Sequence, residues 1–199
     1  MHFHRGSTII EAVVALGVIS IGLFASANLV FSNLALVDRD TDEVVAVNLA
    51  REALEIGKQV RDSNWLAARS FDTGIIASGD GTMVPEWRGD ALQTAPAFDP
   101  VPNVVTDSAA RVVRMDNGMF VNRTASVPNA AVSSTTEFRR LVTAQYLCMD
   151  AAGTVDVRAA SAGCGSEDVA GLRLRADIQW TRSGSVRRTS VYADLYDWK

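Results

Sequence analysis

One apolar run near the N-terminus constrains this chain more than any other feature. From Ile9 to Val37 the only ionisable residue is Glu11, and the other polar residues are three serines and two asparagines. A helix rises about 1.5 Å per residue, so a helix of this length exceeds the roughly 30 Å hydrocarbon core of a bilayer. The run therefore predicts a helix that spans a membrane over about residues 9–37 and protrudes beyond it.

The charges on either side of the run predict its orientation. Arg5 precedes the run, whereas four acidic residues follow it between positions 38 and 43. Positively charged flanks stay on the cytoplasmic side of a span. We therefore expect a single-pass protein with residues 1–6 in the cytoplasm and the chain after the span outside it.

Three interpretations of the N-terminus compete, and Glu11 separates them. A secretory signal peptide would be cleaved at Ala25-Ser26-Ala27, but Glu11 interrupts its apolar core and apolar residues resume after the site. A plain membrane anchor leaves Glu11 unexplained, because a carboxylate near the centre of a span costs about 2.5–3.5 kcal/mol. Cleavage after Gly6 would instead make the α-amine of Ser7 a cation, one helical turn before Glu11.

The residues from Gly6 to Leu16, GSTIIEAVVAL, resemble the N-terminal signal of type IV pilins and pseudopilins. The resemblance implies a leader of residues 1–6, cleavage after Gly6 by a prepilin peptidase, and methylation of the new N-terminus. It also implies that Glu11, the fifth residue of the mature chain, contacts the N-terminal amine of a neighbouring subunit in the filament. The family usually has Phe or Met where this chain has Ser7, so methylation of Ser7 stays open.

From this resemblance we expect a structural subunit rather than an enzyme. Its partners would be other pilin subunits, in a homo- or hetero-filament, the prepilin peptidase, and the pilus assembly machinery in the inner membrane. The chain would be a membrane protein before assembly and part of an extracellular pilus at the cell surface afterwards. Major pilin, minor pilin, secretion pseudopilin and competence pilin all remain open. The alternative is a single-pass anchored or Sec-secreted extracytoplasmic binding domain.

The helix is expected to continue to residue 66 with a different character. Between residues 44 and 66 apolar residues recur every three or four positions, which is typical of an amphipathic helix with one buried face. This stripe consists of Val45, Leu49, Ala53, Ile56 and Val60. The run RDSNWL, residues 61–66, resembles the end of the long helix in bacterial pilin-like proteins. We therefore predict one long helix over residues 7–66.

The remaining residues, 67–199, predict a loop-rich head built on an antiparallel sheet. Residues 67–110 are rich in Gly, Pro, Asp and Ser, which indicates loops with one or two short strands. Further strand candidates are residues 111–115, 119–122, 137–149, 172–180 and 186–195, with turns at Asn117-Gly118 and Ser183-Gly184. The predicted fold class is α+β, in which a long N-terminal helix, membrane-spanning first and amphipathic later, packs on a mainly antiparallel sheet.

The two cysteines, Cys148 and Cys164, bracket a loop rich in Gly and Ala. A disulfide is permitted outside the cell, and closing a loop of about 15 residues is worth roughly 3 kcal/mol. Two free thiols remain the alternative on these grounds. In pilin-like proteins a C-terminal disulfide often delimits a surface loop, so the resemblance implies that Cys148 and Cys164 are bonded.

The sequence predicts no catalytic, cofactor-binding or metal site. The only histidines, at positions 2 and 4, lie in the predicted leader, which removes them from any catalytic triad or zinc site of the mature chain. Asp72-Thr73-Gly74 matches the aspartic-protease motif, but that chemistry needs two such carboxylates and the motif occurs once. The acidic run after Val37 begins like a calcium-binding loop, but Glu43 replaces its glycine and Leu49 replaces its bidentate glutamate.

Nucleic-acid binding has little support in the composition. The net charge is −4, whereas proteins that bind polyphosphates usually carry a basic surface. A local basic patch on the predicted C-terminal hairpin remains open, made of Arg173, Arg175, Arg187 and Arg188. Ordinary solvated strand faces account for the same four residues.

Overall fold

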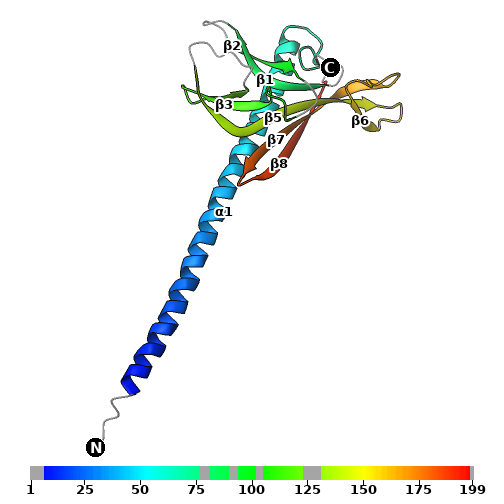
Figure 1. Ribbon diagram of the computed structural model, residues 1–199. Helices are drawn as coiled ribbons and strands as arrows, with labels where there is room; N and C mark the ends of the chain where they lie inside the picture. Colours follow the sequence, from blue (N-terminus) through cyan, green and yellow to red (C-terminus); the bar gives the residue numbers. More distant parts are fainter. Residues whose placement is uncertain (1–6, 77–80, 90–93, 102–104, 123–130, 198–199) are drawn as a thin grey trace, which may run out of the picture. The chain divides into compact units, whose positions relative to one another are not determined.

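The computed structural model of the 199-residue chain describes residues 7–76, 81–89, 94–101, 105–122 and 131–197. Within these ranges there are one helix and eight strands (Figure 1). They are α1 (Ser7–Leu66), β1 (Thr82–Gly89), β2 (Thr94–Pro100), β3 (Arg111–Met115), β4 (Phe120–Asn122), β5 (Val132–Met149), β6 (Val155–Ala159), β7 (Asp168–Arg182) and β8 (Ser185–Tyr196). The expected α+β class is confirmed, with one long N-terminal helix and an antiparallel sheet.

The chain divides into two compact units, residues 1–44 and residues 45–199. The boundary falls inside α1, so the first unit contains the N-terminal part of the helix. The second unit contains the last turns of α1, from Val45 to Leu66, together with all the described strands. We call this second unit the head.

The strands of the head are all paired antiparallel, and β5 is the central strand. Different parts of β5 pair with β1, β3, β6 and β7, while β2, β4 and β8 pair with β1, β3 and β7 respectively. The predicted hairpins β3–β4 and β7–β8 are confirmed. In the second, Ser183 and Gly184 have φ of 49° and 77°, and such positive values at both positions are typical of a tight two-residue hairpin turn.

The sheet is larger than the sequence pattern predicts. The strand predicted from residue 137 begins at Val132, and the strand predicted from residue 172 begins at Asp168. The two strands of the loop-rich segment 67–110, β1 and β2, agree in number with the one or two expected there, but they are longer than the short strands predicted. The loop between the cysteines contains β6, which was not predicted. Long central strands gain their extra residues from tertiary pairing, which local alternation does not reveal.

The end of α1 is closed by local hydrogen bonds. The amide of Arg69 donates to the Asn64 carbonyl at 2.8 Å, and Ala68 between them has a left-handed φ of 52°. The buried Asn64 side chain donates through Nδ2 to the carbonyls of Phe71 and Thr73, at 3.3 and 2.7 Å. Asn64 therefore ties the chain that leaves the helix back onto its last turn.

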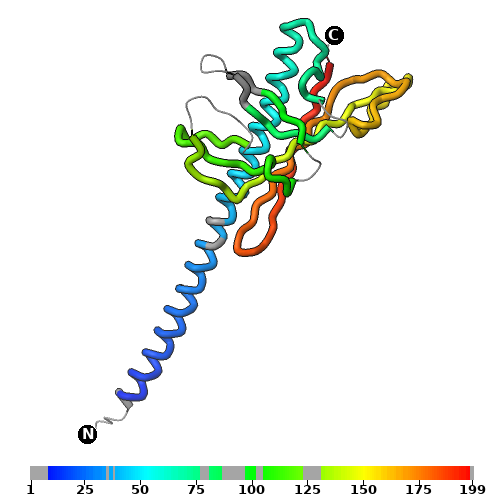
Figure 2. The backbone as a smooth tube through the Cα atoms, turned by 45° about the horizontal axis from the view of Figure 1, so that its top comes forward, coloured from blue at the N-terminus to red at the C-terminus, as the bar shows by residue number. Residues whose placement is uncertain are grey.

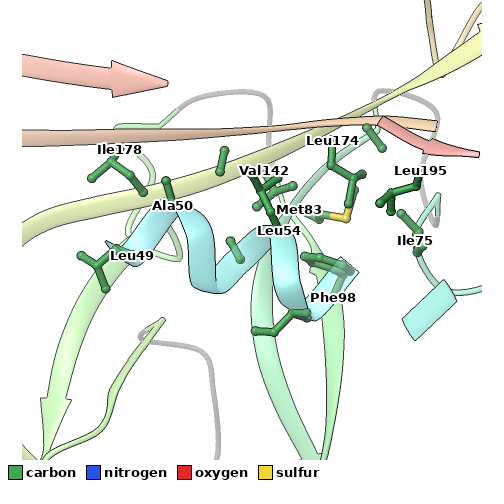
Figure 3. Packing of buried hydrophobic residues seen from close by; sticks show 14 of the residues in the cluster. Leu49, Ala50, Leu54, Ile75, Met83, Phe98, Val142, Leu174, Ile178 and Leu195 are labelled. Atoms are coloured by element: carbon green, nitrogen blue, oxygen red, sulfur yellow. The ribbon is translucent and has the colours of Figure 1, made fainter. Parts of the chain in front are cut away.

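The core of the head forms between α1 and the inner face of the sheet (Figure 3). The helix presents small residues to the strands, since Ala46, Ala50 and Ala53 are fully buried. A Cβ added at Gly57 would collide with Leu174 Cδ1. The predicted stripe is correct at Leu49, Ala53 and Ile56, whereas Val45 and Val60 lie at its margin and are only partly buried. Small side chains bring the helix backbone close to the strands, and the apolar pattern alone did not distinguish them.

Candidate assembly segment

The first unit exposes a long apolar surface. The large apolar side chains of α1 between Ile9 and Val37 are each 50–72% exposed. By length and hydropathy this helix is able to cross a membrane. Exposed apolar surface of this extent is unfavourable in water and marks a site of contact with lipid or with other proteins.

The hydroxyl groups of this helix bond to its own backbone. Ser20 Oγ donates to the Leu16 carbonyl at 2.7 Å, and Ser26 Oγ donates to the Gly22 carbonyl at 2.8 Å. Such bonds to the carbonyl four residues earlier satisfy a hydroxyl without water. These serines are therefore compatible with an apolar environment on every side of the helix.

Glu11 is the one ionisable side chain of the segment. It lies in the first turns of α1, one turn after Ser7, at which the helix begins, and it is exposed. Glu11 makes no hydrogen bond or ion pair with any residue that the structure describes. Gly6 and the rest of the predicted leader lie outside the described residues. The contact of Glu11 with a neighbouring subunit's amine, and the cleavage before Ser7, stay predictions.

A buried polar cluster fixes the head end of the same helix onto the sheet. Arg140 of β5 is 1% exposed, and its Nη1 donates to the Leu49 carbonyl at 3.2 Å and to Glu52 Oε2 at 3.0 Å. Its Nε donates to Asn122 Oδ1 of β4 at 3.0 Å. Burial lowers the pKa of the Arg140 guanidinium, and the attraction of Glu52 opposes this shift. Arg140 therefore links α1, β4 and β5 through charge-assisted hydrogen bonds.

The second member of this cluster, Asn122, is also fully buried. Its Nδ2 donates to the carbonyls of Ala109 and Arg140, both at 3.2 Å. Sequence reasoning missed the cluster, although one signal was present. Arg140 shares its strand face with Val142 and Ala144, so an arginine occupies an inward-facing position. An inward arginine needs buried partners, and these come from distant parts of the chain.

The disulfide between Cys148 and Cys164 is present, as the resemblance implied. It joins the end of β5 to the segment after β6, with 5.3 Å between the two Cα atoms, and both cysteines are buried. An ion pair between Arg158 and Glu167 lies in the same region. The loop between the cysteines is therefore held at its base by a covalent bond and in its middle by β6.

The four arginines of the β7–β8 hairpin, considered above for a local basic patch, are paired or dispersed. Arg173 makes two hydrogen bonds to the Asp194 carboxylate, at 2.7 and 2.8 Å, and these bonds raise its pKa. Arg175 Nε donates to Asp177 at 2.9 Å. Arg187 lies opposite the buried Trp180 in the register, and so on the other face of the sheet from Arg188. Carboxylates and strand alternation therefore disperse the four charges.

No arrangement for metal binding occurs in the part of the chain that the structure describes, where no three His, Cys, Asp or Glu side chains gather in a suitable group. The Asp72 motif forms a turn, in which the Asp72 carbonyl accepts the amides of Ile75 and Ile76 at 2.9 and 3.2 Å. Its carboxylate accepts a hydrogen bond from Ser70 Oγ. The geometry at Asp72 is that of a hydrogen-bonded turn.

Comparison of the chain with protein-family models, curated proteins and solved structures gives no match. The functional argument therefore depends on the residues and contacts described above. Two of these carry most of it, the exposed apolar helix of the first unit and the position of Glu11 within it.

Proposed function

We propose that this chain is a type IV pilin-like structural subunit, cleaved after Gly6 by a prepilin peptidase and assembled into an extracellular pilus or pseudopilus. The observation that supports this most is the apolar surface of α1, exposed from Ile9 to Val37, with a single carboxylate one turn after Ser7. Its function is assembly, and the partners are other pilin subunits, the peptidase and the assembly machinery of the inner membrane.

The apolar helix suits two environments in succession. In the bilayer its side chains contact lipid, and in a filament the same side chains pack against other helices, so the transfer exposes little of them to water. The hydroxyls of Ser20 and Ser26 bond to the helix backbone and tolerate both environments. The helix therefore anchors the subunit in the membrane before assembly and later becomes part of the filament core.

Glu11 gives the helix a preferred partner. A carboxylate in an apolar environment is unfavourable unless a cation neutralises it. Cleavage after Gly6 produces such a cation, the α-amine of Ser7, and the amine of a neighbouring subunit can reach Glu11 when the helices bundle. The ion pair forms in the filament, so it favours the assembled state and sets the relative height of adjacent helices.

The decisive variant is Glu11→Val, made in the full chain in a host that carries a prepilin peptidase and the assembly machinery. We expect normal cleavage, because Glu11 lies beyond the cleaved bond, and a drop of at least about tenfold in the amount recovered with sheared filaments. Glu43→Gln, outside the apolar run, is the matched control and should assemble normally. Assembly of Glu11→Val at the wild-type level would contradict the proposal and favour a plain membrane anchor.

A further inference from the structure

An open groove lies at the end of the head where α1 terminates. It has a volume of about 1080 Å³, and the aromatic residues Trp65, Phe71, Tyr146 and Tyr196 contribute to its lining. Asp72, Asp168 and Asp197 line it too, against a single arginine, Arg69. Aromatic faces beside carboxylates are suited to bind an organic cation such as a guanidinium. The groove therefore favours a positively charged occupant.

Two contacts within the head show that its aromatic rings accept guanidinium groups. Arg61 lies over the ring of Trp65, with its Cζ 5.2 Å from the ring centroid. Arg173 lies over Tyr192 at 4.9 Å. Trp65 is itself part of the groove lining. An arginine of another chain would therefore make the same kind of cation–π contact as Arg61 and Arg173 make within the head.

The opposite charge lies at the other end of the β7–β8 hairpin. From Ile178 to Ala193 the chain contains three arginines, at positions 182, 187 and 188, and no carboxylate. Arg187 and Arg188 project from opposite faces of the hairpin, so the positive charge surrounds the turn and does not form a patch on one face. Arg182 and Arg188 already have partners, and that of Arg188 is the neutral Gln179, whose Oε1 accepts its Nε at 3.0 Å. The two-residue turn between β7 and β8 makes this end narrow, and the side chain of Val186 beside it is 57% exposed. We call the segment from Arg182 to Arg188 the basic turn.

The groove and the basic turn are too far apart to meet within one copy. Asp168 begins β7 and Arg182 ends it, and 15 residues of strand at about 3.3 Å per residue separate them by roughly 45 Å. Figure 2 shows the turn and the end of α1 at opposite ends of the hairpin.

We propose that the basic turn of one copy docks into the acidic aromatic groove of the next copy of this chain. The contact joins two different surfaces, so it is heterologous and repeats in one direction, as the subunits of an open filament require. The inference deepens the proposed function and rests on it, since it assigns a contact between heads in the filament. Screened charges make this contact weaker at high ionic strength.

A cysteine pair tests the contact directly. In the full chain Ser70→Cys places a thiol in the groove and Ser185→Cys places one beside the turn, and the two native cysteines are already bonded to each other. Oxidation of membranes or filaments carrying the double variant should give a ladder of covalent multimers. Each single variant should stay monomeric, because a heterologous contact does not bring two copies of the same surface together. Dimers of either single variant, or a double variant without a ladder, would overturn the proposal.

Charge reversal provides a second test, made in the same double-cysteine variant. Arg188→Glu or Asp168→Arg alone should lower the multimer yield about fivefold or more, because each puts like charges in contact. Both together should restore it to within about twofold, since each copy carries both surfaces. Arg114→Glu, an exposed arginine on β3, is the matched control and should change nothing. Failure of the double reversal to restore the ladder would contradict the pairing.

The same cells separate this inference from the proposed function. Cleavage before Ser7 and the dependence of assembly on Glu11 test the pilin-like function, independently of any contact between heads. Filaments that form without the ladder would overturn the docking contact alone. A ladder in membranes from a chain that is never cleaved would support docking and contradict the pilin-like function. A ladder that requires a different protein would overturn docking between copies.

Discussion

The two parts of α1 use their apolar side chains in opposite ways. From residue 9 to residue 37 large side chains cover every face of the helix and all are exposed. From Ala46 to Gly57 apolar residues form one buried face, on which alanine and glycine lie beside Leu49, Leu54 and Ile56 and let the sheet approach the backbone. The distribution of apolar side chains around the helix therefore separates a segment that needs lipid or other helices around it from one that packs on its own sheet.

This difference makes the head separately measurable in the intact chain. All four tryptophans, at positions 65, 87, 180 and 198, belong to the second unit. Tryptophan fluorescence during denaturation of the detergent-solubilised full chain therefore reports on the head and not on the apolar segment. Substitutions in the head should therefore shift this transition, whereas substitutions in the apolar segment should leave it unchanged.

The largest effect is expected from Arg140→Ala. The substitution leaves Glu52, Asn122 and the Leu49 carbonyl without their shared donor inside the head. Water reaches Glu52, whose side chain is 38% exposed, but the buried Asn122 Oδ1 and Leu49 carbonyl each cost about 1–3 kcal/mol when left without a donor, so we expect a loss of about 3–5 kcal/mol in the free energy of unfolding. Arg114→Ala, on an exposed position of β3, should change it by less than about 0.5 kcal/mol. Equal effects of the two substitutions would refute the structural role of the cluster.

The disulfide should contribute the next largest effect. Replacing both Cys148 and Cys164 by Ala should lower the free energy of unfolding of the head by about 3 kcal/mol, because the unfolded chain regains the freedom of the closed loop. Reduction of the wild-type chain should have a similar effect and the Ala variant should not respond to reductant. A double variant as stable as the oxidised wild type would show that β6 alone holds the loop.

Gly57→Ala tests the close approach of helix and sheet. Alanine gains about 1 kcal/mol of helix propensity, but its Cβ would overlap the buried Leu174 side chain, and overpacking costs about 1–3 kcal/mol. We expect a net loss of about 1 kcal/mol. Gly22→Ala is the matched control, since nothing lies within 4 Å of the added Cβ there. It should leave the fluorescence transition of the head unchanged, and a stabilised Gly57→Ala head would contradict the close packing.

The smallest effect concerns Tyr146 in the groove. Burial, and then the charge of Asp72, raise the pKa of Tyr146 above its usual value of 10.0. Because the folded pKa is raised, its contribution to stability is complete below the unfolded pKa and is lost as the pH rises through the folded pKa. Tyr146→Phe should reduce the loss of head stability above pH 10, by less than about 1 kcal/mol. An unchanged alkaline profile would exclude this role.

The sequence predicts the features that depend on local pattern. The apolar run and the stripe after it predict α1, and Asn117-Gly118 and Ser183-Gly184 predict the β3–β4 and β7–β8 hairpins. Arg140 illustrates what local pattern leaves out, because its partners Leu49 and Glu52 lie about 90 residues away in the chain. The partner of Arg173 was hidden from local pattern for a related reason, since Asp194 reaches Arg173 only through strand pairing.

The candidate site and the groove also differ in how far the sequence predicts them. The disulfide between Cys148 and Cys164 is confirmed. Glu11 lies exposed on the apolar helix, and its contact with a neighbouring subunit stays a prediction. The groove beside Tyr146 was not predicted, because Trp65, Tyr196 and Asp168 are brought together by the sheet and the end of α1. Sequence patterns reveal a surface built from consecutive turns of one helix more readily than one assembled from several elements.

The most direct test of the central claim is the intact mass of the chain, together with its N-terminal sequence, after extraction from membranes of a host with a prepilin peptidase. The account predicts a mature chain that starts at Ser7, with the Cys148–Cys164 bond intact; methylation would add one methyl group to its mass. Gly6→Leu should abolish this cleavage and serves as the control. A chain that starts at Met1 or at Asn28 would contradict the account, since the first is a plain anchor and the second a secretory signal.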